Sequence, residues 1–268
     1  MWRSSCSPSV RTGRTPMGER PARPPGREVS AVAVVIPVHD EEVLLPRCLR
    51  ALETAVSRLR RARPRLRVEV VLVLDACTDG SAAVAARHGV HVMTTDSRCV
   101  GMARAAGTDA AGALLGVGTD RSPSEAWLAS TDADSMVPPH WLTDQISSAA
   151  GGADLVLGRV RPDPEDLEVG LRRAWLREHC DTDPTRHVHG ANLGVRWDAL
   201  EAVGGFKPVV EHEDVLLVQA VLSHGAHVVP GREVLTSGRR RGRVPGGFSG
   251  YLRELARNSA LPPLVESD

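Results

Sequence analysis

The chain has 268 residues, a length that suits one large domain or two small ones with a buried core of their own. Its 33 basic and 33 acidic residues give a formal net charge of +0, which argues against a protein built mainly to coat nucleic acid or a membrane. Hydrophobic residues make up 42% of the chain, as in soluble globular proteins, whereas aromatic residues make up 3%, too few for a base-stacking surface.

The first segment, residues 1–30, is rich in Pro, Gly, Arg and Ser and poor in apolar residues. Such a composition cannot offset the entropy cost of ordering, so we expect a disordered tail. A basic arm that binds RNA or lipid headgroups is the functional alternative for this tail. The expected organisation is a tail over 1–30, one domain over 31–245, and a C-terminal helix and tail over 246–268.

From residue 31 the pattern alternates between strands and helices. The β-branched runs AVAVVIPV (31–38) and VEVVLVL (68–74) predict buried strands, because strands covered on both faces are apolar throughout. Apolar residues at helical spacing predict an amphipathic helix over 44–59. The next expected elements are a short helix from Ser81, a strand over 90–95, a helix over 100–115, and strands over 126–131 and 153–160.

This alternation predicts an α/β fold with a mostly parallel sheet and helices on both faces. Ligands bind such sheets at the carboxyl ends of the strands. The second half is less regular. There we expect helices near 166–179, over 213–224 and over 251–258, and a Gly-, His- and Asn-rich loop over 187–194.

Cysteine content and hydropathy bear on the cellular compartment. The five cysteines form no C-x-x-C pair and are odd in number, so neither a disulfide framework nor a thiolate zinc site is expected. No apolar stretch approaches the roughly 20 residues that span a bilayer, and no hydrophobic segment follows the charges near the N-terminus. We therefore predict a cytoplasmic protein without a transmembrane segment, and leave peripheral membrane contact open.

Acidic residues follow three of the predicted strands. His39-Asp40-Glu41-Glu42 follows the first strand, Asp75 the second, and Asp132-Ala-Asp134 the fourth. These acids would converge on one cleft, which requires cations or hydrogen-bond donors there. Asp132 and Asp134 point to the same side of an extended segment and can hold Mg²⁺ or Mn²⁺ bound to a diphosphate. The alternatives are a solvated Asp-rich turn at 132–134 and a turn cap at Asp75.

Three further polar groups each have two interpretations. The acids of Glu211-His212-Glu213-Asp214 favour the dipole of the helix that they open, or one of them is a general base. His187 and His189 are metal ligands or, more simply, loop histidines satisfied by hydrogen bonds. The arginines at 239–243 clamp a phosphate or carboxylate, or lie in an exposed loop.

Taken in this order, the segments resemble glycosyltransferase family 2, which has the GT-A fold. The resemblance rests on VVIPVHDEE (34–42), DACTDGS (75–81), GMARAAG (101–107), TDADS (131–135), HGANLGVR (189–196), GGF (204–206) and EHEDVLL (211–217). Most of these segments are weak singly, but the ordered set is specific. It implies one GT-A domain, a Rossmann-like, mostly parallel sheet flanked by helices, whose C-terminal half forms the acceptor side.

The resemblance implies donor-binding roles near the N-terminal half of the sheet. Pro37, His39 and Glu41 match the loop that approaches the nucleotide. Asp75 matches the acid that contacts the base, and Arg104 matches an arginine near the donor.

It also implies the metal, catalytic and acceptor sites. Asp132 and Asp134 match the D-x-D pair that binds the donor diphosphate through a divalent metal, Mg²⁺ or Mn²⁺. Asp214, in the pair Glu213-Asp214, matches the catalytic base. The residues that match the loop and turn shaping the acceptor side include Gly190, Asn192 and Gly205.

The implied reaction moves a sugar from a nucleotide-diphosphate sugar to a hydroxyl of a small-molecule or lipid-headgroup acceptor. The metal and nearby donors would stabilise the leaving diphosphate while Asp214 takes the proton of the attacking hydroxyl. The transition state should resemble an oxocarbenium ion, and inversion is expected by analogy with most of the family.

Three positions depart from the family pattern. The second strand ends in Leu74-Asp75, where many members carry two acids. The family often has a third metal ligand, a histidine, in the segment that here spans 234–239 without one. Arg239, Arg240 and Arg243 could clamp a phosphate there and supply part of the missing positive charge. Gln219 stands near a position where arginine is common, which argues against a polymer synthase.

Other classes fit less well. A dehydrogenase would carry G-x-G-x-x-G after the first strand, where PVHDEE stands instead. A sugar-phosphate nucleotidyltransferase shares the architecture but needs a Gly-rich basic loop at that place. A non-catalytic nucleotide-sugar-binding protein is disfavoured by the acids at 132, 134 and 214. We expect no nucleic-acid partner; salt-sensitive RNA binding lost with residues 1–30 would revive that alternative.

Overall fold

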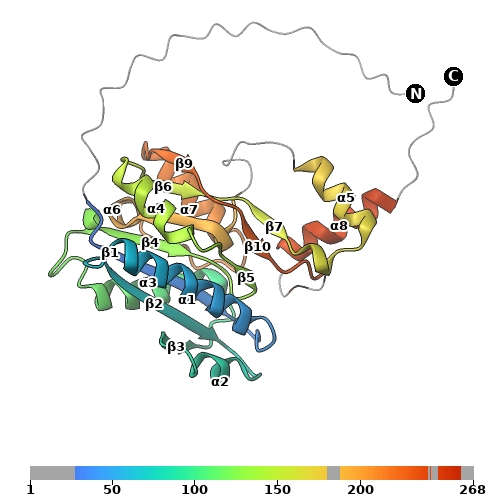
Figure 1. Cartoon of the computed structure of the whole chain (residues 1–268), viewed down its shortest axis with the longest axis horizontal. Helices are drawn as coiled ribbons and strands as arrows, with labels where there is room; N and C mark the ends of the chain where they lie inside the picture. The colour runs from blue at the N-terminus through green and yellow to red at the C-terminus, as the bar shows by residue number, and fades with distance from the viewer. Residues whose placement is uncertain (1–27, 180–187, 241, 243–246, 261–268) are drawn as a thin grey trace, which may run out of the picture.

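The computed structural model describes residues 28–179, 188–240, 242 and 247–260, and shows an α/β fold built on a seven-stranded sheet (Figure 1). The strand order is β3-β2-β1-β4-β8-β6-β9, and β8 alone runs antiparallel to its neighbours. A three-stranded sheet has the order β5-β10-β7. The described strands are β1 (Ala31–Val38), β2 (Arg67–Asp75), β3 (His91–Thr95), β4 (Ala126–Ser130), β5 (Ser135–Met136), β6 (Leu155–Leu157), β7 (Val160–Pro162), β8 (Leu193–Arg196), β9 (Val228–Pro230) and β10 (Val234–Thr236).

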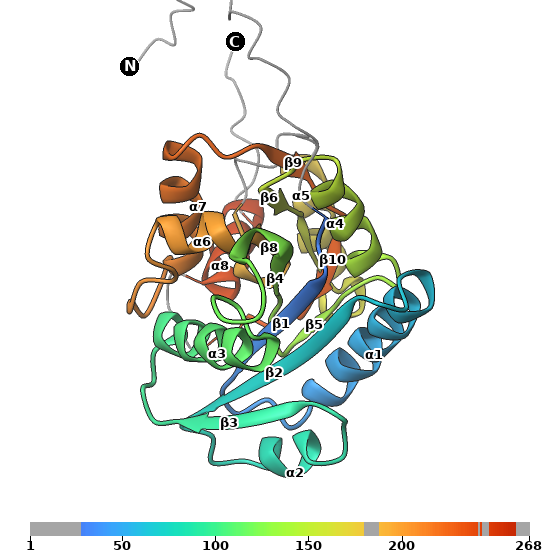
Figure 2. The same ribbon diagram turned by 90° about the vertical axis from the view of Figure 1, so that its left-hand side faces the viewer.

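Helices cover both faces of the large sheet (Figure 2). Helices α1, α2 and α4 share one hydrophobic cluster with the sheet, and α3, α6 and α7 share the other. In β1, Val32 and Val34 belong to the first cluster and Ala33 and Val35 to the second, because successive side chains alternate between faces. The described helices are α1 (Leu45–Ala62), α2 (Ser81–Ala85), α3 (Val100–Leu115), α4 (Trp141–Ala150), α5 (Val169–Glu178), α6 (Trp197–Ala202), α7 (Glu213–Ser223) and α8 (Phe248–Ala260).

The expected strand over 153–160 is wrong as a single element. It consists of β6 in the large sheet and β7 in the small one, with the break at Gly158. A Cβ at Gly158 would overlap the amide of Asn192 and the carbonyl oxygen of Arg232. Glycine allows this close approach at the point where the chain leaves the large sheet and enters the small one.

Two elements in the middle of the chain differ from expectation. Residues 193–196, which overlap the expected loop over 187–194, form β8, and all four residues are buried between β4 and β6. The preceding glycine and asparagine are typical of turns and mask this short strand. Helix α4 was not expected because Ser, Thr and Asp interrupt its buried stripe of Trp141, Leu142 and Ile146.

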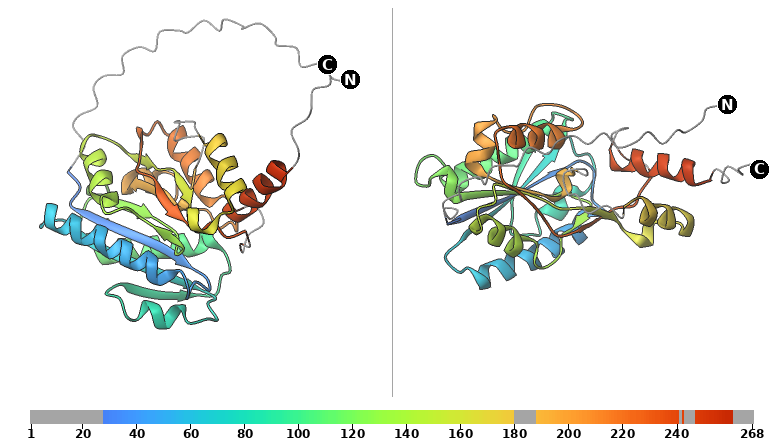
Figure 3. Two further views of the ribbon diagram at one scale, coloured as in Figure 1. Left: turned by 45° about the vertical axis from the view of Figure 1, so that its right-hand side comes forward. Right: turned by 90° about the horizontal axis from the view of Figure 1, so that it is seen from above.

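Helices α5 and α8 lie far apart in the sequence but pack together at one end of the molecule (Figure 3). They confirm the helices expected near 166–179 and over 251–258, and α7 confirms the one over 213–224. The pair has its own hydrophobic cluster, separate from the two on the sheet. Its buried members are Leu171, Ala174, Trp175, Leu252 and Leu255.

Both ends of the expected organisation lie partly outside the described residues. Most of the expected tail over 1–30 and the last residues, 261–268, are not described. Among the helices that are described, none is both long and apolar enough to cross a membrane.

The contact of α3 with the sheet depends on Gly107. A Cβ at this position would lie 2.6 Å from Val35 Cγ1 and 2.7 Å from Val73 Cγ2. We expect Gly107→Val to lower the free energy of unfolding by about 2 kcal/mol, because the added groups overpack the interface. Urea denaturation followed by circular dichroism measures this change.

Gly170→Ala is the matched control, since a Cβ at Gly170 in α5 meets no atom within 4 Å. It should be neutral or stabilise the protein by up to about 1 kcal/mol through helix propensity. Equal unfolding free energies of the Gly107→Val variant and the wild type would contradict this account of the α3 interface.

Candidate active site

The carboxyl ends of β1, β2 and β4 open into a cavity of about 660 Å³. Helices α5 and α8 contribute side chains to its wall. The fold brings distant parts of the chain together here, since Glu41 and Arg239 are 198 positions apart. The sequence-predicted site residues that line the cavity are Pro37, His39, Glu41, Asp75, Arg104, Asp132, Asp134, Gly190, Glu213, Asp214 and Arg239.

Arg104 is the most enclosed cation of the cavity, with 2% of its surface exposed. From α3 its Nε donates to Glu213 Oε1 at 3.0 Å and its Nη2 donates to Asp132 Oδ1 at 2.5 Å. Its Nη1 donates to Ser130 Oγ, and its Cζ lies 5.9 Å from the centroid of the Phe206 ring. One guanidinium therefore joins α3, the end of β4 and the start of α7.

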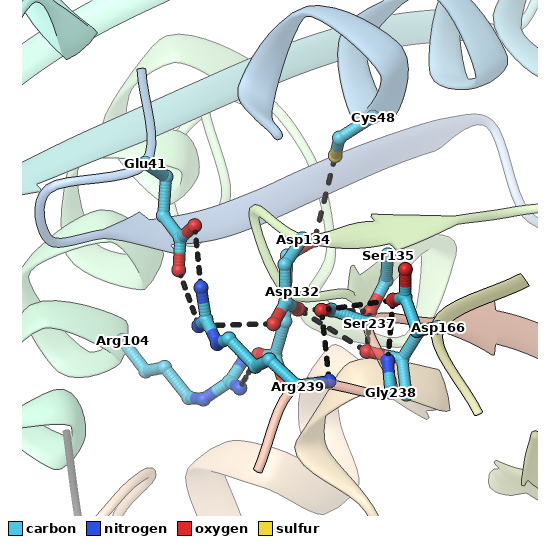
Figure 4. A network of polar contacts seen from close by, with 11 residues as sticks. Glu41, Cys48, Arg104, Asp132, Asp134, Ser135, Asp166, Ser237, Gly238 and Arg239 are labelled. Atoms are coloured by element: carbon cyan, nitrogen blue, oxygen red, sulfur yellow. Dashed lines mark hydrogen bonds and ion pairs between the residues drawn. The ribbon is translucent and has the colours of Figure 1, made fainter. Parts of the chain in front are cut away.

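Asp132 and Asp134 follow β4 and both reach the cavity (Figure 4). Asp134 Oδ1 accepts a hydrogen bond from Thr236 Oγ1 at 3.2 Å, and Asp134 Oδ2 lies 3.0 Å from Arg239 Nη2. Burial and the charge of Asp132 raise the pKa of Asp134 to about 6, although Arg239 acts in the opposite direction. Burial and the neighbouring acid thus oppose ionisation of Asp134 more strongly than the nearby guanidinium favours it.

Arg239 follows β10 and binds Glu41 through both oxygens of its carboxylate. Arg239 Nη1 donates to Glu41 Oε2 at 2.9 Å, and Nη2 donates to Oε1 at 2.6 Å. Glu41 is 6% exposed, so its carboxylate is largely removed from water and depends on this bidentate partner. Arg239 ends the segment in which the family resemblance suggests a third metal ligand.

The charge balance of the cavity fits a divalent cation. Its carboxylates outnumber its guanidinium groups, so a diphosphate could enter only together with additional positive charge. Asp132 and Asp134 offer the carboxylate oxygens that Mg²⁺ and Mn²⁺ prefer. The acids in the lining are Glu41, Asp75, Asp132, Asp134, Glu211, Glu213 and Asp214, and the guanidinium groups belong to Arg98, Arg104 and Arg239.

A second group of candidate metal ligands lies outside this cavity. One ligand atom each of Asp40, Cys77 and Asp79 lie within 4.8 Å of one another. The Asp40 carboxylate accepts hydrogen bonds from the amides of Thr78 and Asp79 at 2.6 and 3.2 Å, which holds this turn in place. These hydrogen bonds explain the position of Asp40 by a structural role in the turn.

The two acids that begin α7 have different surroundings. Glu213 is 5% exposed and paired with Arg104, and burial raises its pKa although Arg104 lowers it. Asp214 Oδ1 accepts from the amide of Val215 at 2.7 Å, and Oδ2 accepts from that of Gly190 at 2.5 Å. A Cβ at Gly190 would lie 2.6 Å from Arg104 Nη2, so only glycine fits here. Backbone amides thus orient the Asp214 carboxylate, whereas Glu213 neutralises and holds the Arg104 guanidinium.

Asp75 organises the loop that leads into α3. Its Oδ1 accepts from the amides of Ser97 and Arg98 at 2.7 and 3.0 Å, and its Oδ2 from that of Cys99 at 2.9 Å. Burial raises the pKa of Asp75, but these hydrogen bonds outweigh it and hold the pKa below its usual value. His39 Nδ1 lies 2.6 Å from the carbonyl oxygen of Asp75, which joins the first loop to the second.

Several predicted residues lie away from the cavity. Asn192 is 1% exposed, and its amide donates to two backbone carbonyl groups and accepts from an indole N–H. Gly205 has a φ of 66° in the turn after α6. Arg240 is exposed and lies 3.0 Å from Glu168. His187 and Arg243 fall outside the described residues.

An aromatic wall of the cavity was not foreseen from the sequence. Trp175 of α5 and His179, which caps this helix, stack with ring centroids 3.4 Å apart. Phe248 and Tyr251 of α8 meet Trp175 edge to face, with centroid distances of 5.5 and 5.8 Å. All four side chains line the cavity. The chain has only one Tyr and two Phe, so the presence of the Tyr and one Phe in α8 is notable in the sequence. Their contact with Trp175 could not be predicted, because it forms only when α5 and α8 pack together.

The family assignment follows from a match over most of the described sheet. The profile of Glycosyl transferase family 2 matches residues 33–202, from β1 to the end of α6. The chain belongs to glycosyl transferase family 2. The match includes Arg104 and the Asp132–Asp134 pair, the residues on which the geometry of the cavity depends.

Two curated relatives of this family 2 glycosyltransferase resemble part of it. Undecaprenyl-phosphate 4-deoxy-4-formamido-L-arabinose transferase of Pseudomonas aeruginosa is 35% identical over 153 residues, 56% of this chain and 39% of the relative. An uncharacterised glycosyltransferase of Mycobacterium tuberculosis is 33% identical over 146 residues, 54% of each chain. The chain thus spans between about two fifths and about half the length of these relatives.

Solved GT-A glycosyltransferases share the fold. Glucosyl-3-phosphoglycerate synthase of M. tuberculosis aligns with a TM-score of 0.52 at 17% identity, covering 86% of this chain and 80% of that one. A mannosyltransferase of Pyrobaculum calidifontis, solved with GDP-Man and Mn²⁺, aligns with a TM-score of 0.54 at 18% identity, covering 82% and 60%. These likenesses confirm the expected α/β GT-A fold.

The buried Arg104–Glu213 pair should be essential for stability. We expect Arg104→Met to lower the free energy of unfolding by about 3–5 kcal/mol, because it leaves Glu213 charged and unpaired in the interior. Adding Glu213→Gln should recover part of this loss, as urea denaturation would measure.

The matched control is Arg232→Met, which removes an exposed ion pair with Asp144 and should leave the unfolding transition unchanged. If Arg104→Met behaved like this surface variant, the central role of Arg104 would be refuted.

Proposed function

We propose that this chain transfers a sugar from a nucleotide-diphosphate sugar to a hydroxyl group of a small-molecule or lipid-headgroup acceptor, with a divalent metal and with Asp214 as general base. One observation carries the proposal: Asp132, Asp134 and Asp214 line one cavity around the buried Arg104. Membership of glycosyl transferase family 2 supports the reaction class.

The diphosphate of the donor would lie beside Asp132 and Asp134, which would hold Mg²⁺ or Mn²⁺. When bound, the ion neutralises charge on the leaving diphosphate. Arg104 keeps the Asp132 carboxylate in one orientation, and Arg239 is the cation best placed to bind phosphate oxygens. Structures of two GT-A neighbours, one with GDP-Man and one with UDP-Glc, contain Mn²⁺, which supports this assignment.

The nucleotide would lie over the ends of β1 and β2. Pro37, His39 and Glu41 line this part of the cavity, as does Asp75. The hydrogen bonds that Asp75 accepts from residues 97–99 give this loop a fixed shape before a donor arrives. We therefore assign Asp75 both a positioning role and the contact to the base that the family resemblance implies.

Asp214 takes the proton of the acceptor hydroxyl while that oxygen attacks the anomeric carbon. The bond from this carbon to the diphosphate oxygen breaks as the new bond forms, so the leaving group departs on the opposite face and the configuration inverts. The Gly190 amide holds the Asp214 carboxylate for this step. Glu213 acts as a positioning residue that keeps Arg104 in place.

The acceptor would enter between Gly190 and the aromatic wall of Trp175, His179, Phe248 and Tyr251. Aromatic rings offer a large apolar contact area at a low cost in conformational entropy. The P. aeruginosa relative is named for undecaprenyl phosphate, a lipid phosphate, and the M. tuberculosis neighbour for phosphoglycerate, a small molecule. Both names support the two acceptor classes proposed here. A cytoplasmic location stays a prediction.

The metal assignment predicts nucleotide binding that depends on Mn²⁺. Calorimetry with UDP, GDP and TDP, each with and without Mn²⁺, should find one nucleotide that binds only with the ion. Asp134→Asn should weaken this binding by at least about tenfold, because it removes a charged oxygen ligand. Asp144→Asn, an acid paired with Arg232 at the surface, is the control and should bind normally. Equally tight binding in EDTA would refute the metal requirement.

The base assignment predicts that Asp214→Asn retains donor binding and lowers kcat by about 10²–10⁴, the usual contribution of a general base. The measurement is a transfer assay with the nucleotide sugar identified above, together with calorimetry of the donor. Asp198→Asn is the control, since Asp198 Oδ1 also accepts the amide of the next residue, at 2.8 Å, but its side chain is exposed. Normal turnover of the Asp214→Asn variant would exclude Asp214 as the base.

A further inference from the structure

Arg239 joins two acids that follow neighbouring strands of the large sheet, Glu41 after β1 and Asp134 after β4. Its guanidinium donates to both Glu41 oxygens, and its Nη2 also lies 3.0 Å from Asp134 Oδ2 (Figure 4). The side chain of Arg239 is 31% exposed and lines the cavity, so a ligand in the cavity can reach it. The acid that would bind the metal is therefore already paired with a cation of the protein.

The backbone of Arg239 is held independently of its side chain. Asp166 Oδ2 accepts hydrogen bonds from the amide of Gly238 at 2.7 Å and from Ser237 Oγ at 3.3 Å. A Cβ at Gly238 would lie 2.8 Å from Asp166 Cβ, so glycine allows this close contact. With the turn fixed in this way, the guanidinium can exchange partners without a change in the backbone.

Few carboxylate oxygens remain for a metal ion in this arrangement. Asp134 Oδ1 accepts from Thr236 Oγ1, Asp134 Oδ2 faces Arg239, and Asp132 Oδ1 accepts from Arg104. Among the described residues, Asp132 Oδ2 is the one oxygen of this pair with neither a hydrogen bond nor an ion pair. Because Mg²⁺ and Mn²⁺ require several oxygen ligands at once, the ion alone has little to bind.

We propose that Arg239 makes metal binding at Asp132 and Asp134 depend on the diphosphate of the donor. In the free protein, Arg239 is the counter-ion of Asp134 and Glu41. When a diphosphate arrives, the guanidinium turns from Asp134 to the phosphate oxygens, and the freed Asp134 oxygen becomes a metal ligand. This inference rests on the proposed function, in which the diphosphate and the metal share this site.

The chemistry of the guanidinium group favours this exchange. A planar guanidinium forms two parallel hydrogen bonds with a phosphate as readily as with a carboxylate. The diphosphate also brings oxygen ligands for the ion, so the metal gains ligands from both the donor and Asp134 in the same event. A nucleotide sugar and a metal would thus bind together, and each would raise the affinity of the other.

Titration of Mn²⁺, with the free ion measured by electron paramagnetic resonance, tests the proposal without an acceptor. The wild-type protein should bind Mn²⁺ weakly alone and more tightly with the one of UDP, GDP and TDP that calorimetry identifies. Arg239→Gln should bind Mn²⁺ about tenfold more tightly without any nucleotide, because the variant lacks the ion pair that competes with the metal for Asp134. The dependence of Mn²⁺ affinity on nucleotide should shrink in this variant.

Two control variants assign the effect to this site. Arg161→Gln removes the same charge from β7, where Arg161 Nε donates to Glu233 at 2.8 Å, and should bind Mn²⁺ like the wild type. The double variant Arg239→Gln/Asp134→Asn should lose the gain in affinity. Persistence of the gain in this double variant would place the ion elsewhere, for example at Asp40, Cys77 and Asp79, and would overturn the proposal.

Arg239→Gln leaves the enclosed Glu41 carboxylate without this partner, which could unfold the protein. The variant Arg239→Gln/Glu41→Gln removes both charges and should show the same gain in Mn²⁺ affinity, with folding checked by circular dichroism. Unchanged Mn²⁺ affinity in both variants would overturn the proposal but not the proposed function. Absence of Mn²⁺ binding in every variant, with and without UDP, GDP or TDP, would overturn the metal requirement itself.

Discussion

The active site depends on the burial of one guanidinium group. Arg104 is almost fully removed from water, so its charge must be balanced by acids within the interior. Glu213 and Asp132 supply this balance, and they come from α7 and from the end of β4. The same contact requires a glycine at 190, whose amide then reaches Asp214. A single buried charge thus sets the positions of Asp132, Glu213 and Asp214 relative to each other.

The acids around the cavity differ in whether their main partners are groups of the protein or a ligand in the cavity. Glu213 holds Arg104 and Asp75 holds the amides of residues 97–99, so both shape the site although they also line the cavity. Asp132, Asp134 and Asp214 each reach the cavity, where a ligand can contact them. Burial is the main cause of the raised pKa of Asp134, and the charges of Asp132 and Glu41 add to it. In the proposed function, a cation and an anionic donor would enter this acidic cavity together.

The parts of the site that were predictable from the sequence are those encoded locally. The apolar run of β1 and the position of Asp132 and Asp134 directly after β4 reveal the sheet edge and its acids, because strand periodicity and neighbouring residues are enough to read them. The contact between Glu41 and Arg239 could not be predicted from the sequence, because these residues are 198 positions apart and meet only through the path of β10. The different fates of Glu213 and Asp214, which are adjacent in sequence, likewise depend on which partner each meets in the fold.

Helices α5 and α8 are held to each other by a hydrophobic cluster that they do not share with the sheet. A substitution inside this cluster therefore repacks one wall of the cavity and leaves both large cores untouched. In the proposed function this wall contacts the acceptor, so acceptor choice can diverge there while the proposed donor-binding residues stay under their own structural constraints. The architecture thus separates what the protein can change over evolutionary time from what it must keep.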